Sequence, residues 1–232
     1  MNLKNFLVLT SQKNLAGMNI VRELKKISNL PIHIFEEDIV YPENIDKKLS
    51  KYDFFIFAST HKSKQHNKTL SVHAIGNWNK AELGGKDKTA VKTSAFFNKY
   101  LFTKLNEFAK FLPEYSLTLE ATHHGPYIDK PSCFIELGST EEEWKDEEGG
   151  KIIARAIKNF IESFNDSDNN FIPAVAIGGT HYCPSFNKVQ LNSKYAIAHV
   201  LPQYHLPFTE NMIHQAVSNT IENPDTIILD WK

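Results

Sequence analysis

The first 35 residues carry the pattern that most constrains the fold: two short apolar runs separated by one amphipathic segment. Phe6 to Leu9 is wholly apolar, which is typical of a parallel strand buried on both faces. Residues 14–27 place apolar side chains three or four positions apart, the spacing of a helix with one buried face. Pro31 then precedes a second extended run, Ile32 to Phe35. This β-α-β opening predicts an α/β fold.

The rest of the chain repeats the same two patterns. Extended runs predict strands over residues 53–58, 70–75, 116–121, 132–137, 171–177, 195–200 and 226–229. Helical spacing predicts helices over residues 93–112, 139–164 and 209–220. Ser139 with Glu142, or Thr140 with Glu143, makes a capping box at the start of the second of these helices. We therefore expect one domain over residues 1–232, with three α/β/α layers around a mixed sheet.

The charge distribution gives only a partial indication of nucleic-acid binding. The formal net charge is −1, so no overall basic field attracts a polyanion. Between Thr60 and Lys104, however, only Glu82 and Asp87 oppose a set of lysines. These are Lys62, Lys64, Lys68, Lys80, Lys86, Lys88, Lys92, Lys99 and Lys104. Such a segment can bind phosphates, although composition alone favours an ordinary solvated surface.

The cysteines and the apolar runs indicate where the protein resides. Cys133 and Cys183 are far apart and form no CxxC motif, so a reduced, cytoplasmic protein is the simplest expectation. No apolar run approaches the roughly 20 residues that span a bilayer. The apolar part of the N-terminus is too short for a signal peptide. We expect a soluble protein without membrane contact, with a monomer as one possible state.

The stretch from 117 to 140 concentrates the residues best suited to chemistry. The extended run ending near Ala121 leads into His123 and His124, after which Gly125 and Pro126 break the chain. Adjacent strand residues point to opposite faces, so only one of the two histidines should face a given pocket unless the strand has already ended. Two carboxylates, Glu120 in the first run and Glu136 in the second, should lie in the same small region.

Seven of the ten histidines lie at predicted strand ends or in the turns that follow them. They are His61, His73, His123, His124, His181, His199 and His205. Histidine serves as a base, an acid or a metal ligand because its ring nitrogens change role near neutral pH. A single histidine in a turn is nevertheless more often a plain surface residue. His124 and His181 are the strongest candidates, since neighbouring glycines should expose them, whereas we expect Cys183 to be a small buried side chain.

Several common motifs are absent from the sequence. It contains no GxGxxG or P-loop motif in the first turn, no HExxH, no Cys/His pair at zinc-finger spacing and no GxSxG elbow. A zinc site assembled from separate turns is compatible with the chain, but ligand spacing does not demonstrate one.

An ordered set of short segments resembles the archaeal and plant type of D-aminoacyl-tRNA deacylase. The segments are SVHAIGNW at 71–78, AELGG at 81–85, ATHHGP at 121–126, FIELGST at 134–140, GGTHYCP at 178–184 and LPQYHL at 201–206. The resemblance covers nearly the whole chain, with small departures at Asn79 and Ala198, where the family often has glycine. It implies a fold akin to phosphorylase and peptidyl-tRNA hydrolase domains, and a hydrolase that cleaves the ester between a D-amino acid and the terminal ribose of tRNA. It also implies zinc as a cofactor and, in some members, the clearing of aldehyde-modified D-aminoacyl-tRNA.

The resemblance and the strand-end placement together suggest roles for individual residues. We expect His124 to act as base or metal ligand, with His123 as its rival and His181 beside them, and Glu136 or Glu120 to orient a histidine. The expected zinc ligands are His123, His124 and His181. Backbone amides of Gly125, or of Gly178 and Gly179, would stabilise the oxyanion. Asn77 and Trp78 would receive the terminal adenosine, although Trp78 is equally explained as a core residue, and Lys62, Lys64, Lys80 and Lys86 would hold acceptor-stem phosphates.

Other readings remain open from the sequence. Water could be activated by a metal, by a histidine or by the neighbouring ribose hydroxyl. The chain could instead be a phosphorylase or nucleosidase acting on free nucleosides, or a tRNA-binding protein without catalytic activity. Turnover of small nucleosides would indicate the former, and tRNA binding that survives loss of every turn histidine would indicate the latter.

Overall fold

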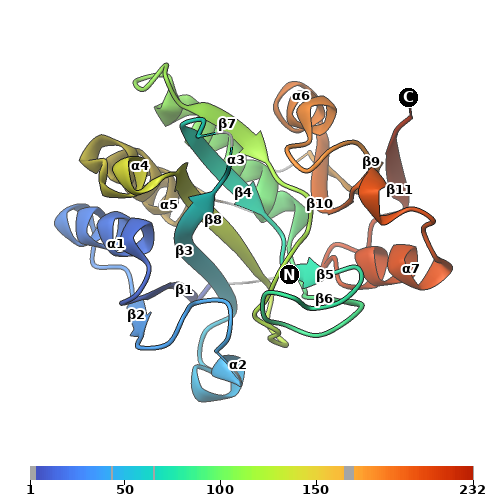
Figure 1. Ribbon diagram of the computed structural model, residues 1–232, viewed down its shortest axis with the longest axis horizontal. Helices are drawn as coiled ribbons and strands as arrows, with labels where there is room; N and C mark the ends of the chain where they lie inside the picture. Colours follow the sequence, from blue (N-terminus) through green and yellow to red (C-terminus); the bar gives the residue numbers. More distant parts are fainter. Residues whose placement is uncertain (1–3, 43, 65, 165–169, 232) are drawn as a thin grey trace.

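The computed structural model describes residues 4–42, 44–64, 66–164 and 170–231. Its centre is a six-stranded sheet with the order β2-β1-β3-β8-β4-β7 (Figure 1). The strands are β1 (Phe6–Ser11), β2 (Ile32–Phe35), β3 (Phe54–Lys62), β4 (Thr69–His73), β7 (Ser116–Leu119) and β8 (Ser132–Ser139). All neighbours are parallel except β4 and β8, which are antiparallel. The expected α/β fold with a mixed sheet is therefore confirmed.

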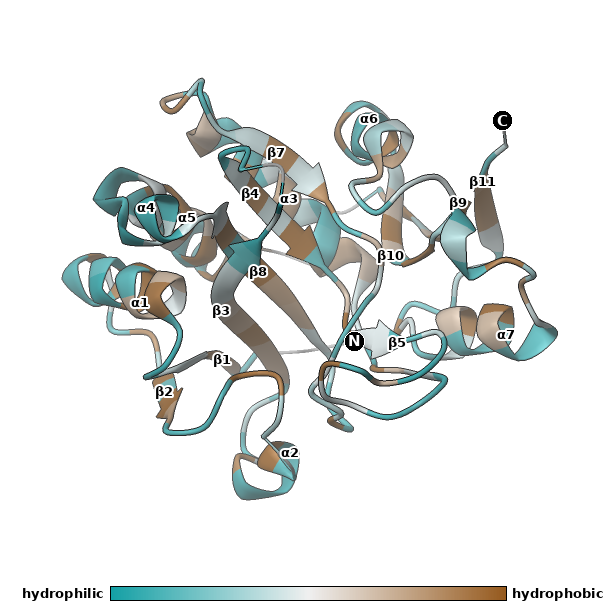
Figure 2. Cartoon of the chain, in the orientation of Figure 1, coloured by the Kyte–Doolittle hydropathy of each residue, from teal (hydrophilic) through white to brown (hydrophobic). Residues whose placement is uncertain are grey.

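Three helices cover one face of this sheet. They are α1 (Leu15–Ile27), α3 (Ala95–Ala109) and α5 (Glu147–Ser163), and α5 contacts both of the others. The apolar core beneath them takes alternate residues of each strand, for example Phe54 and Ile56 of β3. In Figure 2 the strands are largely hydrophobic, whereas the outward side of the short α4 (Glu141–Lys145) is hydrophilic.

The opposite face of the sheet positions the functional site. The other alternate residues, such as Phe55 and Phe57 of β3 and Phe134 of β8, form a second core with Val40, Ile45 and Ile128. Irregular segments and the single turn of α2 (Ile45–Lys48) cover this core. At the carboxyl-terminal end of the same strands the apolar residues give way to histidine and glutamate.

A second, three-stranded parallel sheet has the order β10-β9-β11. Its strands are β9 (Ile172–Gly178), β10 (Tyr195–Leu201) and β11 (Thr226–Asp230). The helices α6 (Pro184–Asn192) and α7 (Glu210–Ser218), the 3₁₀ turn η2 (Gln203–His205) and the two-residue strands β5 (Gly76–Asn77) and β6 (Thr89–Ala90) lie beside it (Figure 1). Helix α3 contacts strands of both sheets, and the buried Lys99 of α3 donates to the carbonyls of Gln190, Ser193 and Tyr195.

The structure corrects several predicted boundaries. Strand β3 does not end at Ala58 but continues to Lys62, because residues 59–62 pair with residues 136–139 of β8, which itself extends past Leu137. The predicted helix over 139–164 is two helices. Asp146 ends α4 and its side chain accepts the amide of Glu148 to start α5. Of the two proposed capping boxes, that of Thr140 and Glu143 is formed. Helices α2 and α6 were not predicted.

Within the ranges given above, none of the helices combines the length and the apolar character needed to cross a bilayer.

Candidate active site

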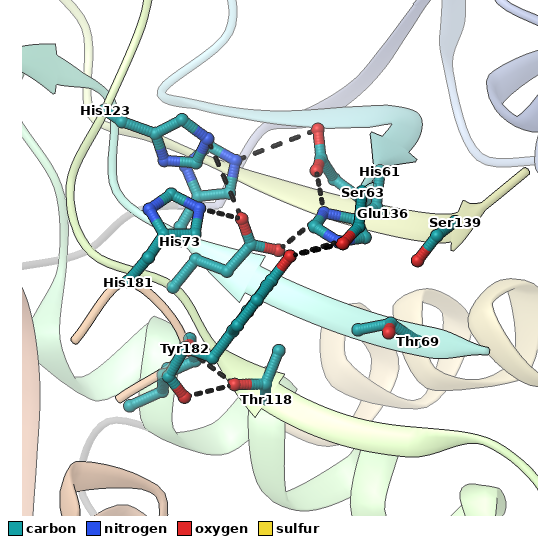
Figure 3. A network of polar contacts seen from close by, with 12 residues as sticks. His61, Ser63, Thr69, His73, Thr118, His123, Glu136, Ser139, His181 and Tyr182 are labelled. Atoms are coloured by element: carbon teal, nitrogen blue, oxygen red, sulfur yellow. Dashed lines mark hydrogen bonds and ion pairs between the residues drawn. The ribbon is translucent and has the colours of Figure 1, made fainter. Parts of the chain in front are cut away.

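Four side chains from neighbouring strands meet on the sheet face that lacks the long helices (Figure 3). His61 belongs to β3, Glu136 to β8 and His73 to β4, and Glu120 follows the end of β7. The strand register explains why they meet. Glu136 pairs with Ser59 and Ser71, and His61 and His73 lie two residues beyond these partners, on the same face. Strand register therefore gathers His61, His73 and Glu136, and the amide of Glu120, which donates to the carbonyl of Val72 at 3.1 Å, fixes the fourth residue beside them.

Glu120 is the centre of this cluster. Its carboxylate is fully buried, with Oε1 3.0 Å from Nδ1 of His61 and Oε2 3.0 Å from Nε2 of His181. Nε2 of His123 lies 3.7 Å from the same Oε2 atom. Glu136 takes the neighbouring place, 3.7 Å from Nδ1 of His61 through Oε2. One buried carboxylate thus touches three histidines that are far apart in the sequence.

The buried charges shift the pKa values of these groups in opposite directions. Burial by itself would lower the pKa of His61, but contacts with Glu120 and Glu136 raise it to about 11, so this imidazole is protonated. Burial would likewise raise the pKa of Glu120, but its hydrogen bonds with His181 and His61 hold the pKa well below the usual value. Burial and the nearby His73 lower the pKa of His124 to about 4, and lower that of His123 as well. His123 and His124 are therefore neutral near pH 7.

Three imidazoles present their Nε2 atoms in a way that suits metal binding. Nδ1 of His73, His123 and His124 lies 2.7–3.0 Å from the backbone oxygens of Ala74, Ala121 and Gly125, respectively. A carbonyl oxygen only accepts, so each Nδ1 carries the hydrogen, and in the neutral ring each Nε2 keeps its lone pair. One ring nitrogen from each histidine lies within 4.8 Å of the others.

This arrangement has both features of a protein zinc site: several imidazole ligands and outer partners that fix each ring. Nε2 of His73 is buried and, among the described residues, has no hydrogen-bond partner. The charge of Glu136, 3.7 Å away, raises the pKa of His73 against the effect of burial. A metal would displace that proton.

Both His123 and His124 face the cluster, as expected for the case in which the strand ends before them. Their ring centroids are 4.4 Å apart, and each ring contacts that of His73. Strand β7 ends at Leu119, so strand alternation no longer applies four residues later. His124 adopts a left-handed backbone conformation with φ of 44°, and its carbonyl accepts the amide of Gly76 at 3.0 Å.

His181 reaches the cluster from the second sheet. Its carbonyl accepts the amide of Ala121 at 2.8 Å, which fixes the turn after β9 against the segment after β7. Its Nδ1 lies 3.1 Å from the hydroxyl of Tyr204. The next residue, Tyr182, donates its hydroxyl to Ser63 and lies 3.4 Å from Nε2 of His61. The site is thus shared by the two sheets.

Comparison with known proteins now identifies the family. A family model for D-aminoacyl-tRNA deacylase matches residues 48–232. The chain belongs to this family. A D-aminoacyl-tRNA deacylase from Thermococcus onnurineus is 32% identical to it, over 97% of this chain and 90% of the relative. One from Archaeoglobus fulgidus is 34% identical, over 97% of this chain and 87% of the relative. The crystal structure of a conserved protein of unknown function superposes with a TM-score of 0.91, at 33% identity over 97% of this chain and 86% of that one.

Two residues that were expected to bind nucleoside, Asn77 and Trp78, lie in the interior of the protein. Trp78 is only 3% exposed, packs in the core beside β9 and β10, and donates its indole N–H to the carbonyl of Val200. Asn77 is also buried, and its amide donates to the carbonyl of Gly84. Trp78 therefore offers no ring face for stacking, and the core reading of this residue is the right one.

The glycines expected to form an oxyanion site have mainly structural roles. The amide of Gly125 donates to the carbonyl of Leu83 at 2.9 Å, so it is not free for a substrate oxygen. Gly178 pairs with Asp230 in the second sheet, where a Cβ atom would lie 2.3 Å from the Asp230 carbonyl. Gly179 accepts the amide of Gln203. An oxyanion role for the Gly178–Gly179 turn stays a prediction.

The remaining predicted residues divide between the surface and the core. Lys62 and Lys64 are exposed at the end of β3, and Lys80 and Lys86 are exposed in the loop between β5 and β6. Cys183 is fully buried, as expected. Burial raises the pKa of its thiol, which does not suit a nucleophile. His199 lies inside β10, not in a turn.

Sequence reasoning undervalued four members of the site: His61, His73, Tyr182 and Tyr204. His73 had a usable signal, since it lies two positions after Ser71 in an alternating strand. His61 had one as well, because it continues the alternation of Phe55, Phe57 and Ser59 along the same extended segment. The two tyrosines had none, since their positions depend on how the two sheets meet.

Proposed function

We propose that this chain hydrolyses the ester bond of D-aminoacyl-tRNA, releasing the D-amino acid and the tRNA. Family membership over most of the chain supports the reaction class. The observation that carries the proposal is the buried cluster itself, in which histidines and glutamates converge from both sheets. Groups with strongly shifted pKa values concentrate at catalytic sites, because burying charge costs stability and is retained where chemistry needs it.

The three histidines with carbonyl-fixed rings, His73, His123 and His124, would hold a zinc ion. This set replaces His181 of the expected ligands with His73, since His181 already uses Nε2 to contact Glu120. Zinc in such a place supplies Lewis-acid activation of water and of the ester carbonyl. Once His73 has given up its proton to the metal, the two buried carboxylates carry more charge than the imidazolium at His61, which favours a cation here.

His181 is the residue best placed to transfer protons. Because Glu120 accepts from its Nε2–H at 3.0 Å, its Nδ1 is left as the atom that can take a proton. The buried carboxylate of Glu120 fixes the tautomer and the plane of the His181 ring. The hydroxyl of Tyr204, an exposed residue, lies 3.1 Å from this Nδ1. His61 stays protonated beneath the cluster and balances part of its charge.

Deacylation of matched D- and L-aminoacyl-tRNA by the purified protein tests this function. We expect rapid loss of the D-ester and little loss of the L-ester. An intact D-ester, with folded and zinc-replete protein, would overturn the proposal and would lead to assays on free nucleosides. Activity toward aldehyde-modified D-aminoacyl-tRNA stays a prediction that the same assay can address.

Zinc binding has a separate test that does not depend on activity. Calorimetric titration of chelated protein with zinc should give one tight site, and His73→Ala should remove it, whereas the matched variant His33→Ala, in β2, should not. Unchanged tight binding by His73→Ala would refute the assigned ligands. Full deacylation after exhaustive chelation of a folded protein would refute the metal.

A further inference from the structure

A pocket of about 540 Å³ opens beside the segment that carries His124. Pockets that take small ligands have volumes of about 300–1,000 Å³. Its lining includes Tyr41, Lys47, Gly85, Lys86 and Tyr127. None of these five residues belongs to the histidine–glutamate cluster, and the pocket has no part in the function proposed above.

The pocket and the cluster share one piece of backbone. Pro126 lines the pocket and lies two residues after His124, so their Cα atoms are at most about 7 Å apart. Gly125, between them, donates its amide to Leu83 and packs so closely on Gly85 that an added Cβ would lie 2.2 Å from the Gly85 nitrogen. A ligand in the pocket therefore rests on the same loop that positions the catalytic histidines.

The lining suits an unpaired nucleotide. Tyr41 is 49% exposed. Nζ of Lys86 is held 3.7 Å from the centroid of the Tyr127 ring, and Lys47 adds a second cation. Among the described lining residues the carboxylates are Asp46 and Asp129, and Asp129 is engaged with Lys92 at 2.7 Å, so within this described part of the lining Lys47 and Lys86 outnumber the free carboxylate. Proteins bind single-stranded nucleic acid by stacking bases on aromatic rings and placing phosphates near cations.

We propose that this pocket binds an unpaired nucleotide of the tRNA 3′ end, with its base on Tyr41 and its phosphate near Lys86 and Lys47. This proposal rests on the proposed function, and it supplies the nucleotide contact that the buried Trp78 does not make. Holding the 3′ end on the Gly85–Gly125 contact brings the ester, which is attached to the terminal ribose, to the neighbouring histidines.

Binding of two hairpin RNAs tests the proposal. One carries an unpaired CCA end with D-tyrosine attached through an uncleavable amide, and the other ends bluntly. Tyr41→Ala should weaken binding of the first hairpin by about 5- to 150-fold, the range for loss of one stacked base. Tyr41→Phe keeps the ring and should bind within about twofold of wild type. Neither variant should change binding of the blunt hairpin.

A second pair of variants tests the phosphate contact. Lys86→Ala should reduce the slope of log affinity against log salt by about 0.7, the value for one phosphate of a single strand. Lys188→Ala removes an exposed lysine of α6 and should leave the slope unchanged.

Two results would overturn the inference: an unchanged dissociation constant for Tyr41→Ala on the CCA hairpin, or an equal loss of affinity on both hairpins. Neither result bears on whether wild type cleaves the D-ester. If wild type fails to cleave it while the CCA-specific loss persists, the activity is refuted and the nucleotide pocket stands.

Discussion

Replacing Gly125 with alanine tests whether the loop contact positions the catalytic histidines. Gly125 has no left-handed φ, so alanine meets no backbone strain there, and the effect is purely steric. The new Cβ would lie 2.2 Å from the nitrogen of Gly85, 2.4 Å from the carbonyl carbon of Gly84 and 2.7 Å from the oxygen of Val40. All three are backbone atoms, which cannot rotate away as a side chain does.

The size of the required movement sets the expected effect. Ordinary contact begins near 3.4 Å, so the loop must move by 3.4 minus 2.2, or 1.2 Å. A displacement of about 1 Å at a catalytic group costs roughly 100-fold in rate. Overpacking of this kind costs about 1–3 kcal/mol of stability. We expect Gly125→Ala to fold, to unfold at lower denaturant, and to deacylate D-aminoacyl-tRNA about 100-fold more slowly in single turnover.

Gly149→Ala is the matched control. Its added Cβ would also be crowded, at 2.7 Å, but by the flexible end of the Leu137 side chain on the helix-covered face of the sheet. Because the end of the Leu137 side chain can rotate away, this variant should lose less stability than Gly125→Ala, and it should keep the wild-type single-turnover rate. A wild-type rate for Gly125→Ala would refute the reasoning, because it would mean that the loop absorbs the added methyl group without moving His124. An equal loss of rate in both variants would refute it too, since stability alone would then explain the effect.

Three further predictions concern the cluster and the core. Glu120→Gln keeps the shape of the side chain but removes the charge that His61 and His181 contact. Loss of such an orienting partner should lower the single-turnover rate by about 10- to 100-fold. An unchanged rate would exclude the assigned role of Glu120. His124→Ala should lower it by about 100-fold or more, and full activity would remove this residue from the mechanism. Burial lowers the pKa of the Lys99 ammonium to about 8. Between pH 8 and about 10.5 the unfolded chain therefore holds a proton at Lys99 that the folded chain has released. The free energy of unfolding, measured by urea titration, should rise with pH over this range. Lys99→Met should abolish this rise in the free energy of unfolding. Because it leaves three carbonyls without their donor, it should also lower the free energy of unfolding by about 1–3 kcal/mol at pH 7. If stability still rises with pH in this variant, another group is responsible for the titration.

The sequence specifies the strands and most helices because each is a local pattern. The β-α-β opening, the runs of β8 and β9 and the capping box at Thr140 all follow from periodicity and propensity within a few residues. The end of β3 does not follow from local periodicity, because polar residues such as Ser59 and Lys62 are typical of a turn. They stay in the strand only because β8 pairs with them. Pairing between strands about 75 residues apart in the chain is not encoded in any short window.

The candidate site shows the same division between local and tertiary information. His123, His124 and His181 could be recognised beside their glycines, and Glu120 and Glu136 as possible orienting carboxylates. The sequence could not show which of the strand-end residues face the site. Trp78 and His199 have the same kind of strand-end context and lie in the core. Burial separates them, and burial depends on where the second sheet packs.

The position of Glu120 explains why the site needs both sheets. A carboxylate with no exposure is costly to bury, and such a charge is tolerated only when its partners compensate it. His61 compensates it from the central sheet, and His181 from the turn after β9. Loss of either partner leaves part of that charge uncompensated, so the two sheets are energetically coupled through the candidate active site. The same coupling keeps His181 beside the three metal-ligand candidates. Bringing His181 to the site and pairing the buried charge of Glu120 are therefore the same structural event.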